Sequence, residues 1–256
     1  MRGTLPVFGR ELLRFGRDKT RIVVLLVQPS IWLLFMGSIM NNATSRIPQV
    51  RAFLQGAPDY LAYMAPGIMV LGSLFSSVYC GLSLIHDRER GMLERMLASP
   101  IRRAAVPYGK MLSAATQNVA QALILIATAA LAGARFRTGA PGLVAALAMA
   151  TTVNMGCSAL LLALTLAVRS TETYIAIICC CALPAVSAST IMFPVAFMPD
   201  WFAAAARWNP LSLAVTPIRQ LMNVGWIWSD LYAGLGAAAG SALLLSALVA
   251  LLYREP

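Results

Sequence analysis

The side chains that could do chemistry gather in one stretch, residues 86–110. This stretch holds six of the 20 basic residues, three of the ten acidic residues and the single histidine, and long apolar segments flank it on both sides. His86 beside Asp87 is the pair that a catalytic site near a membrane surface could use for proton transfer. With one histidine, a His-based metal cluster is impossible, and we interpret His86 as a solvated side chain at a membrane boundary.

Other reactive residue types form no site pattern. The five cysteines are Cys80, Cys157, Cys179, Cys180 and Cys181. All fall in apolar segments without a Cys-x-x-Cys pair, so we interpret them as small packing residues and expect neither zinc nor redox chemistry. Gly109-Lys110 lacks the glycine five residues earlier that a phosphate-binding loop needs, so the chain cannot hydrolyse ATP by that route.

The central stretch predicts a short helix. Arg90, Leu93, Leu97 and Ile101 recur at helical spacing, and Glu89, Glu94 and Arg95 fall on other faces. This pattern describes a charged, amphipathic helix against a bilayer surface. Ser99-Pro100 ends it, because the residue before a proline is pushed out of the α region. On spacing alone, an ordinary loop that obeys the positive-inside rule explains the stretch equally well.

The order of residues in this stretch is more specific than its spacing. It reads Asp87-Arg88-Glu89-Arg90-Gly91-Met92-Leu93-Glu94-Arg95-Met96-Leu97-Ala98-Ser99-Pro100-Ile101-Arg102. This string resembles the ABC-2 type permease family, the membrane subunits of ATP-binding-cassette exporters of the drug-resistance and nodulation type. Met92 stands where the family commonly has Thr, and Met96 replaces a Leu. The resemblance extends over the whole chain, because six apolar segments and a second proline-rich motif repeat the family's layout.

The resemblance implies that a separate ATPase pushes on this stretch. The residues implied in that coupling are Glu89, Arg90, Gly91, Leu93, Glu94, Arg95, Leu97, Ser99, Pro100, Arg102 and Arg103. The charged ones would form salt bridges with the ATPase, whereas Leu93, Leu97 and Ile101 would dock the helix to the membrane domain. ATP and Mg²⁺ would be bound by two copies of that partner, and this chain would hold no cofactor and would not be an enzyme by itself.

Composition independently predicts a membrane protein. Hydrophobic residues make up 59% of the chain and charged residues 12%, against about 25% in soluble domains. Segments long enough to cross about 30 Å of hydrocarbon are 22–40, 60–85, 108–133, 143–168, 174–197 and 231–252. The predicted fold is therefore all-α, with six transmembrane helices in one domain, 1–256. Basic blocks alternate with apolar segments, so the net charge of +10 indicates lipid headgroups as partners and not nucleic acid.

The first 21 residues predict an amphipathic helix at the membrane surface. The apolar stripe consists of Leu5, Phe8, Leu12 and Phe15, and the arginines expected to reach headgroups are Arg10, Arg14 and Arg17. A signal peptide is rejected, because the apolar run that follows is too long and lacks a small-x-small cleavage site.

Prolines and small residues predict local features of the spans. We expect a kink at Pro29, an interruption at Pro66-Gly67, and kinks or breaks at Pro184 and Pro194. Small residues in the second span permit close helix contact, either within the subunit or in a dimer. They are Gly72, Ser73, Ser76, Ser77 and Gly81.

Basic residues set the expected orientation. Fourteen of the 20 Lys and Arg residues lie in the N-terminal segment, the central stretch, the turn at Arg169 and the C-terminal tail. By the positive-inside rule these parts are cytoplasmic, which predicts a multi-pass protein of the bacterial inner membrane with both termini in the cytoplasm. The loop 86–107 would then be a cytoplasmic coupling loop within reach of a cytosolic partner.

Residues 198–229, between the fifth and sixth spans, predict two short helices divided at Pro210. Trp201 and Trp208 lie seven residues apart on one helical face and seek the membrane interface. In the resembled family a comparable outer segment, with an Asn-Pro-Leu turn like that at Asn209-Pro210, re-enters the membrane near the exit of the pathway. The alternative is an external loop with aromatic anchors.

Polar residues inside the third and fourth spans are the candidates for a substrate path. They are Gln117, Gln121, Thr151, Asn154 and Ser158. Amides at this depth need partners, either from a neighbouring helix or from a water-lined path. Interhelical hydrogen bonding is the commoner cause, so the path is the sharper and less supported interpretation.

The resemblance implies a permease subunit of an ABC-2 type exporter that works as a homodimer or heterodimer and moves a lipophilic drug-like, lipid-linked or glycan substrate outward. The alternative is an ATP-independent secondary transporter of a hydrophobic solute. Such carriers usually keep an ionisable residue inside a span, and all ten acidic residues lie in loops, ends or turns. An enzyme embedded in the membrane would have only His86-Asp87 to use.

Overall fold

The computed structural model describes residues 3–46, 54, 56–98, 101–168 and 170–226, and, beyond these, residues 232, 236, 239, 240, 242–244 and 246. In this part of the chain every regular element is a helix. Ser99, Pro100, Arg169 and most of the predicted sixth span, 231–252, lie outside the described residues.

Four stretches of helix are long and apolar enough to cross a membrane: Lys19–Asn42, Tyr60–Glu89, Ala105–Leu131 and Gly139–Ala167. They have 24, 30, 27 and 29 residues, and about 20 are needed to span the hydrocarbon core. A fifth apolar helix, α8 (Thr171–Ser187), is shorter. The predicted multi-pass helical membrane fold is therefore confirmed, with four candidate spans in the described part of the chain.

The first span combines three elements, α2 (Lys19–Ile22), η1 (Val23–Val27) and α3 (Gln28–Arg46). The middle element, η1, is a turn of π-helix directly before Pro29. Proline lacks the N–H that the helical ladder uses, and a wider turn is one way to accommodate that loss. The π-helical turn ends at Val27, two residues before Pro29, and the kink expected at Pro29 itself stays a prediction.

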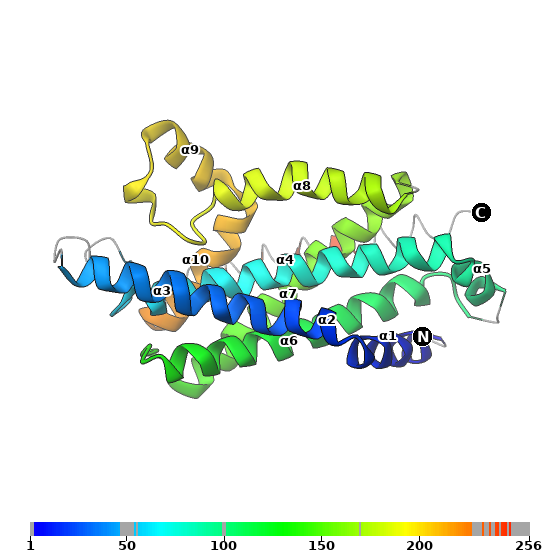
Figure 1. The fold of residues 1–256 in the computed structure, drawn as a ribbon, viewed down its shortest axis with the longest axis horizontal. Coiled ribbons are helices and arrows are strands. Elements are labelled where there is room, and N and C mark those ends of the chain that lie inside the picture. Colours follow the sequence, from blue (N-terminus) through cyan, green and yellow to red (C-terminus); the bar gives the residue numbers. More distant parts are fainter. Residues whose placement is uncertain are drawn as a thin grey trace.

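Helix α4 (Tyr60–Glu89) is the centre of the molecule, with α3, α6 (Ala105–Leu131), α7 (Gly139–Ala167), α8 and α10 (Pro210–Asn223) against it (Figure 1). Asp59 caps its start by accepting a hydrogen bond from the N–H of Ala62 at 2.7 Å. The expected interruption at Pro66-Gly67 is wrong, because α4 continues through both residues. Gly67 is required by a close neighbour, since a Cβ there would overlap the backbone carbonyl of Ile191.

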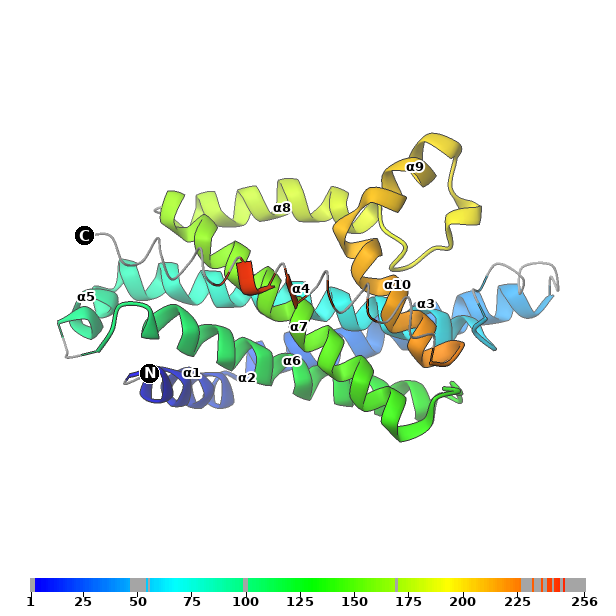
Figure 2. The same cartoon turned by 180° about the vertical axis from the view of Figure 1, so that it is seen from behind.

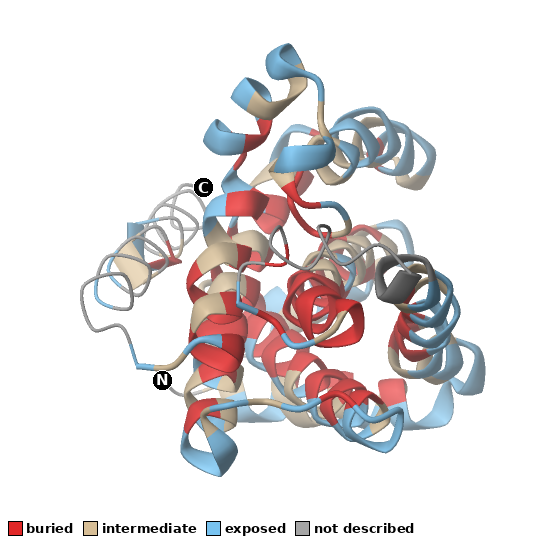
Figure 3. Ribbon diagram, turned by 90° about the vertical axis from the view of Figure 1, so that its left-hand side faces the viewer, coloured by how far each residue is buried: buried red, intermediate tan, exposed pale blue. Residues whose placement is uncertain are grey.

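Burial follows from this arrangement. Viewed along the long axis, buried residues lie where helices face one another, while the outer faces are exposed (Figure 3). The exposed large residues include apolar side chains such as Phe35, Leu131 and Leu183, at 70%, 90% and 65% exposure. Lipid is the solvent that such surfaces require.

The predicted fifth span, 174–197, is longer than the helix the structure has. Helix α8 ends at Ser187, and turns lead to the short 3₁₀ helix η3 (Val195–Phe197). The side-chain amide of Asn209 donates to the carbonyls of Ala185 and Ala188, at 2.6 and 2.9 Å, and so satisfies the end of α8. Pro184 lies inside the helix without breaking it.

The remaining short helices occupy the two ends of the bundle. At one end lie α1 (Thr4–Arg17), α5 (Met92–Leu97) and the turn between α7 and α8, and we call it the basic end. At the opposite end lie the α6–α7 turn and α9 (Asp200–Trp208) (Figure 2). The predicted separation of the segment into two short helices at Pro210 is confirmed, since α9 ends at Trp208 and α10 begins at Pro210.

Candidate functional site

A buried ionic network joins three helices at the basic end. Lys110 at the start of α6 has 1% exposure, and its Nζ donates to Asp87 of α4 at 2.6 Å, to Glu11 of α1 at 3.0 Å and to Ser83 at 2.7 Å. Burying three charges is costly unless they pair, so each ion holds the others in place. The network therefore fastens α1, α4 and α6 together.

Two arginines of α1 extend this network. Arg10 donates to Asp87 at 2.5 Å and to Glu11 at 2.8 Å, and Arg14 donates to Asp87 at 3.3 Å. Burial alone would raise the pKa of the Glu11 carboxyl, but the charge of Lys110 and the hydrogen bonds from Arg10 and Lys110 outweigh it, so that pKa lies below its usual value. These arginines, expected to reach toward headgroups, thus point at a carboxylate of the protein.

The two residues after Asp87 hold the turn between α7 and α8. Arg88 donates to the carbonyls of Thr165 and Val168, at 2.9 and 3.0 Å, at the end of α7. Glu89 accepts from the N–H and the hydroxyl of Thr171, both at 3.0 Å, at the start of α8. Glu89 was predicted to contact an ATPase; in this structure its carboxylate is engaged by Thr171.

Helix α5 follows directly, and most of its predicted coupling residues are on the surface. Gly91 has φ of 64°, a left-handed conformation that turns the chain from α4 into α5 and that glycine tolerates best. The exposed charged residues in and beside α5 are Glu89, Arg90, Glu94, Arg95, Arg102 and Arg103.

The apolar contact of α5 differs in one residue from the prediction. Leu93 and Ile101 pack against the core cluster that contains Leu84 and Val106, as expected. Leu97 is 39% exposed, and Met96 takes its place in that contact. The reason is that the helix ends at Leu97, so the spacing of 93, 97 and 101 does not continue as one helical face.

Of the five polar residues predicted to line a path, four have hydrogen-bond partners, and three of these four lie on α7. Asn154 donates to the carbonyl of Ser73 at 2.9 Å and to the hydroxyl of Ser77 at 3.1 Å, and Ser158 bonds Ser77 at 3.0 Å. Thr151 bonds the carbonyl of Leu147 in its own helix. The bonds of Asn154 and Ser158 join α7 to the small residues of α4, so here the contact within the subunit accounts for both.

The two glutamines of α6 differ sharply. Gln117 accepts from Arg21 at 3.2 Å and donates to Ser113 at 3.0 Å. Gln121, with 3% exposure, has neither its amide nitrogen nor its carbonyl oxygen bonded, and it packs against Gly72, where a Cβ would overlap its amide. A buried polar group left unbonded costs about 1–3 kcal/mol. A ligand that forms a hydrogen bond with the side-chain amide of Gln121 would remove this cost.

Gln121 faces a cavity of about 410 Å³ between the first span, α4 and α8. Its walls are almost entirely apolar and include the aromatic rings of Trp32, Phe75 and Tyr79. Ligand sites are typically apolar cavities with a few polar groups that fix orientation. This cavity, which we call the Gln121 pocket, can therefore hold a lipophilic molecule and offer it the side-chain amides of Gln28 and Gln121.

At the opposite end, the predicted outer segment consists of an exposed helix, α9, and a buried helix, α10. Trp201 and Trp208 of α9 are 74% and 86% exposed, as interface anchors would be. Asn209 caps α10 by accepting from the N–H of Leu211 at 2.9 Å, with Pro210 in the first turn. Helix α10 is buried against α4 and α7.

Sequence reasoning missed two residues. Arg219 of α10 is 1% exposed, lies 3.8 Å over the ring of Tyr63 and donates to the carbonyls of Tyr63 and Thr190. Lys110 was placed in the charged stretch but was given no role. In each case a single basic residue inside an otherwise apolar helix was the available signal.

Cysteine and metal chemistry remain without a site in the described residues, where no three His, Cys, Asp or Glu side chains gather. Cys80 is buried and Cys157 half-buried, as packing residues would be. Cys179, Cys180 and Cys181 are exposed on α8, and Cys179 lines the Gln121 pocket.

Comparison with known proteins agrees with this arrangement. The sequence profile of the family described as ABC-2 type transporter matches residues 5–223. A daunorubicin resistance ABC transporter permease of Streptomyces coeruleorubidus is 25% identical over 252 residues, which cover 98% of this chain and 86% of that protein.

Two further relatives show how widely the similarity extends. A doxorubicin resistance ABC transporter permease of Mycobacterium tuberculosis is 26% identical over 263 residues, covering 98% of this chain and 88% of that protein. A transport permease of Porphyra purpurea, ycf38, is 27% identical over 223 residues, covering 86% and 74%.

Proposed function

This chain belongs to the ABC-2 type transporter family, and we propose that it is the permease subunit of an exporter driven by ATP hydrolysis on a separate subunit. Its basic end faces the cytoplasm of a bacterial cell. Two ATPase copies, with bound ATP and Mg²⁺, act on two permease copies, which are alike or unlike. The excess of Lys and Arg at the basic end supports this orientation.

The observation that carries the proposal is the attachment of α5. Its charged side chains are exposed, while the end of α4 directly before it is tied to four other helices: Asp87 to α1 and α6, Arg88 to α7, and Glu89 to α8. A force on α5 is therefore passed to five helices and is not absorbed by a loose loop. That is the mechanical requirement of a subunit that receives the closing motion of an ATPase.

The Gln121 pocket supports a lipophilic substrate. Its apolar walls suit a drug-like or lipid-linked molecule, and the unbonded amide of Gln121 suits one with a hydrogen-bonding group. Drug-resistance permeases among the relatives agree with this class. A glycan alone would leave most of its hydroxyl groups unbonded against these walls, so a glycan substrate would need an apolar carrier.

At the opposite end, α9 and the Asn209-Pro210 turn form the outer lid of the pathway. Asn209 bonds both α8 and α10, so movement of α8 would be transmitted to the lid. The exposed Trp201 and Trp208 would hold α9 at the outer membrane interface during that movement.

The experiment compares association with the ATPase and its activity in lipid for the wild type and three charge-reversal variants. Glu94→Arg and Arg102→Glu change exposed residues at α5, and Arg135→Glu, in the exposed α6–α7 turn, is the matched control at the opposite end. We expect the first two to lose co-purification or substrate-stimulated ATPase activity by at least about tenfold, a loss of about 1.4 kcal/mol, and the control to retain both.

An ATP-independent secondary transporter is the competing function. It would purify and transport solute alone, and the α5 variants would then behave like the control. That result would overturn the proposal and direct attention to the Gln121 pocket as the whole transport site.

A further inference from the structure

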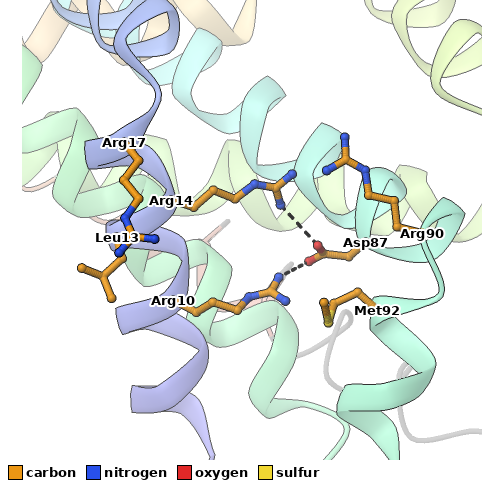
Figure 4. Close-up of a pocket in the computed structure, with 7 residues that line it drawn as sticks. All are labelled: Arg10, Leu13, Arg14, Arg17, Asp87, Arg90 and Met92. Carbon is orange, nitrogen blue, oxygen red and sulfur yellow. Dashed lines mark hydrogen bonds and ion pairs between the residues drawn. The ribbon is translucent and has the colours of Figure 1, made fainter.

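We propose that a hollow at the basic end binds the phosphate headgroup of an anionic phospholipid. The hollow has a volume of about 420 Å³ and lies between α1 and the junction of α4 with α5. Its lining residues are Arg10, Leu13, Arg14, Arg17, Asp87, Arg90 and Met92 (Figure 4). We call it the arginine hollow.

The charges of the arginine hollow are unbalanced. Asp87 is its one carboxylate, and Arg10, Arg14 and the buried Lys110 already bond it. Glu11 behind it is likewise engaged by Arg10 and Lys110. The five cations of the hollow and network therefore exceed the two carboxylates.

Three arginines of the hollow have guanidinium N–H groups without an acceptor among the described residues. Arg17 and Arg90 are exposed, and neither side chain forms a hydrogen bond or ion pair with another described residue. The buried Nε of Arg10 also lacks a partner within the described chain. Guanidinium groups bind phosphate oxygens in paired hydrogen bonds, so a phosphate between α1 and Arg90 would supply the missing acceptors.

The depth of the hollow favours a lipid as the source of the phosphate. Beyond Arg17 the chain continues to Arg21, which bonds Gln117 and lies 5.2 Å over the ring of Tyr79. Tyr79 is two helical turns further into the α4 span than Asp87. The arginine face of α1 thus runs beside the beginning of the apolar spans, where headgroups lie.

Apolar residues at the rim of the hollow also favour a lipid over a free phosphate. Leu13 and Met92 line it and are 65% and 37% exposed. A glycerol backbone or an acyl chain would cover these side chains, whereas a free phosphate or an acidic side chain would leave them in water. Basic sites at the cytoplasmic ends of spans are known to hold anionic headgroups.

The test measures the affinity of the purified chain, in neutral detergent, for short-chain phosphatidylglycerol by thermal shift. Phosphatidylcholine and inorganic phosphate are the two comparison probes. The test variant is Arg17→Gln with Arg90→Gln, which removes no recorded bond, and the control is Arg95→Gln with Arg102→Gln, which removes the same charge outside the hollow. The lipid-free melting temperature of each variant checks its fold.

We expect the wild type to prefer phosphatidylglycerol to both other probes. An arginine near an anionic surface contributes about fivefold in affinity, so the test variant should bind it about 25-fold more weakly while the control stays within about twofold. Equal losses in the two double variants would overturn the proposal, as would phosphate binding as tightly as the lipid.

A third outcome would also overturn it: the test variant keeps its lipid affinity but no longer co-purifies with the ATPase. The hollow would then be a protein contact. Because the lipid measurement uses neither transport nor ATP, it succeeds or fails independently of the proposed exporter function.

Discussion

Lys110 is the buried cation that holds three helices together at the basic end. Its ammonium group is buried at the start of an apolar span, where an unpaired charge would cost several kcal/mol. Asp87 and Glu11, from two other helices, provide the counter-charges. The three residues are far apart in the sequence, and each is stable in its position only because the other two are there.

Replacing this cation should therefore be severe. Lys110→Met leaves two buried carboxylates with fewer partners, and we expect a loss of about 3–5 kcal/mol in the free energy of unfolding. The control is Lys19→Met, where the side chain is exposed and the expected change is within about 0.5 kcal/mol. Denaturation in detergent measures both. Equal stability of the two variants would show that the network contributes nothing.

Acid should weaken the same network through Glu11. The folded-state pKa of Glu11 is lowered, so its stabilisation is complete above the unfolded value of about 4.3 and is lost as the pH falls from there through the folded-state pKa. We expect the melting temperature to fall less between about pH 5 and pH 3 in Glu11→Gln than in the wild type. A parallel fall in both proteins would assign the acid sensitivity to other groups.

The two buried glutamines give a third prediction at this scale. Gln121→Leu should leave the stability unchanged or raise it, because no hydrogen bond is lost, while substrate affinity falls about 5–10-fold. Gln117→Leu should instead destabilise the protein by about 1–3 kcal/mol, because it leaves Arg21 without this acceptor. Thermal unfolding and substrate binding, measured together, separate the two roles. If Gln121→Leu lowers stability as Gln117→Leu does, Gln121 is structural.

At the scale of elements, α4 sets the shape because it touches nearly every other helix. Its small residues are used within the subunit: Gly67 meets the backbone of Ile191, Gly72 meets Gln121, and Gly81 meets Tyr174. The sequence could show that these positions permit close contact. It could not show which partner uses them, since packing within a subunit and packing in a dimer favour the same residues.

Gly67 provides the prediction for this scale. Gly67→Ala puts a methyl group into the carbonyl of Ile191, and the resulting overpacking should cost about 1–3 kcal/mol. The control Gly9→Ala, in α1, meets nothing within 4 Å and should stabilise its helix by about 0.5–1 kcal/mol. We expect the melting temperature to fall in Gly67→Ala and to rise in Gly9→Ala, each relative to the wild type. A stable Gly67→Ala variant would mean that the loop after α8 moves aside easily.

Helices were predicted well where length and hydropathy decide, and poorly where tertiary contacts decide. The four long spans follow from uncharged runs, and the division at Pro210 follows from the loss of a backbone donor. The end of α8 at Ser187 depends on Asn209, which bonds carbonyls 21 and 24 residues earlier. Likewise, the family string marked the charged stretch, but only the fold reveals that Glu89 is bound to Thr171.

At the scale of the whole molecule, the basic end, the Gln121 pocket and α10 contact α4 at successive positions along its length. Asp87 lies at one end of α4, Gly72 and the pocket near its middle, and Tyr63, which Arg219 covers, at the other end. A shift of α4 therefore reaches all three. This is the physical basis for expecting ATP hydrolysis at one face of the membrane to open a path toward the other.

The most direct test is uptake of a lipophilic fluorescent dye into vesicles in which the basic end faces outward, with and without the ATPase and ATP. The account predicts uptake that needs the permease, the ATPase and hydrolysable ATP together, and that is lost in Glu94→Arg but kept in Arg135→Glu. Uptake by the permease alone, without ATP, would contradict it.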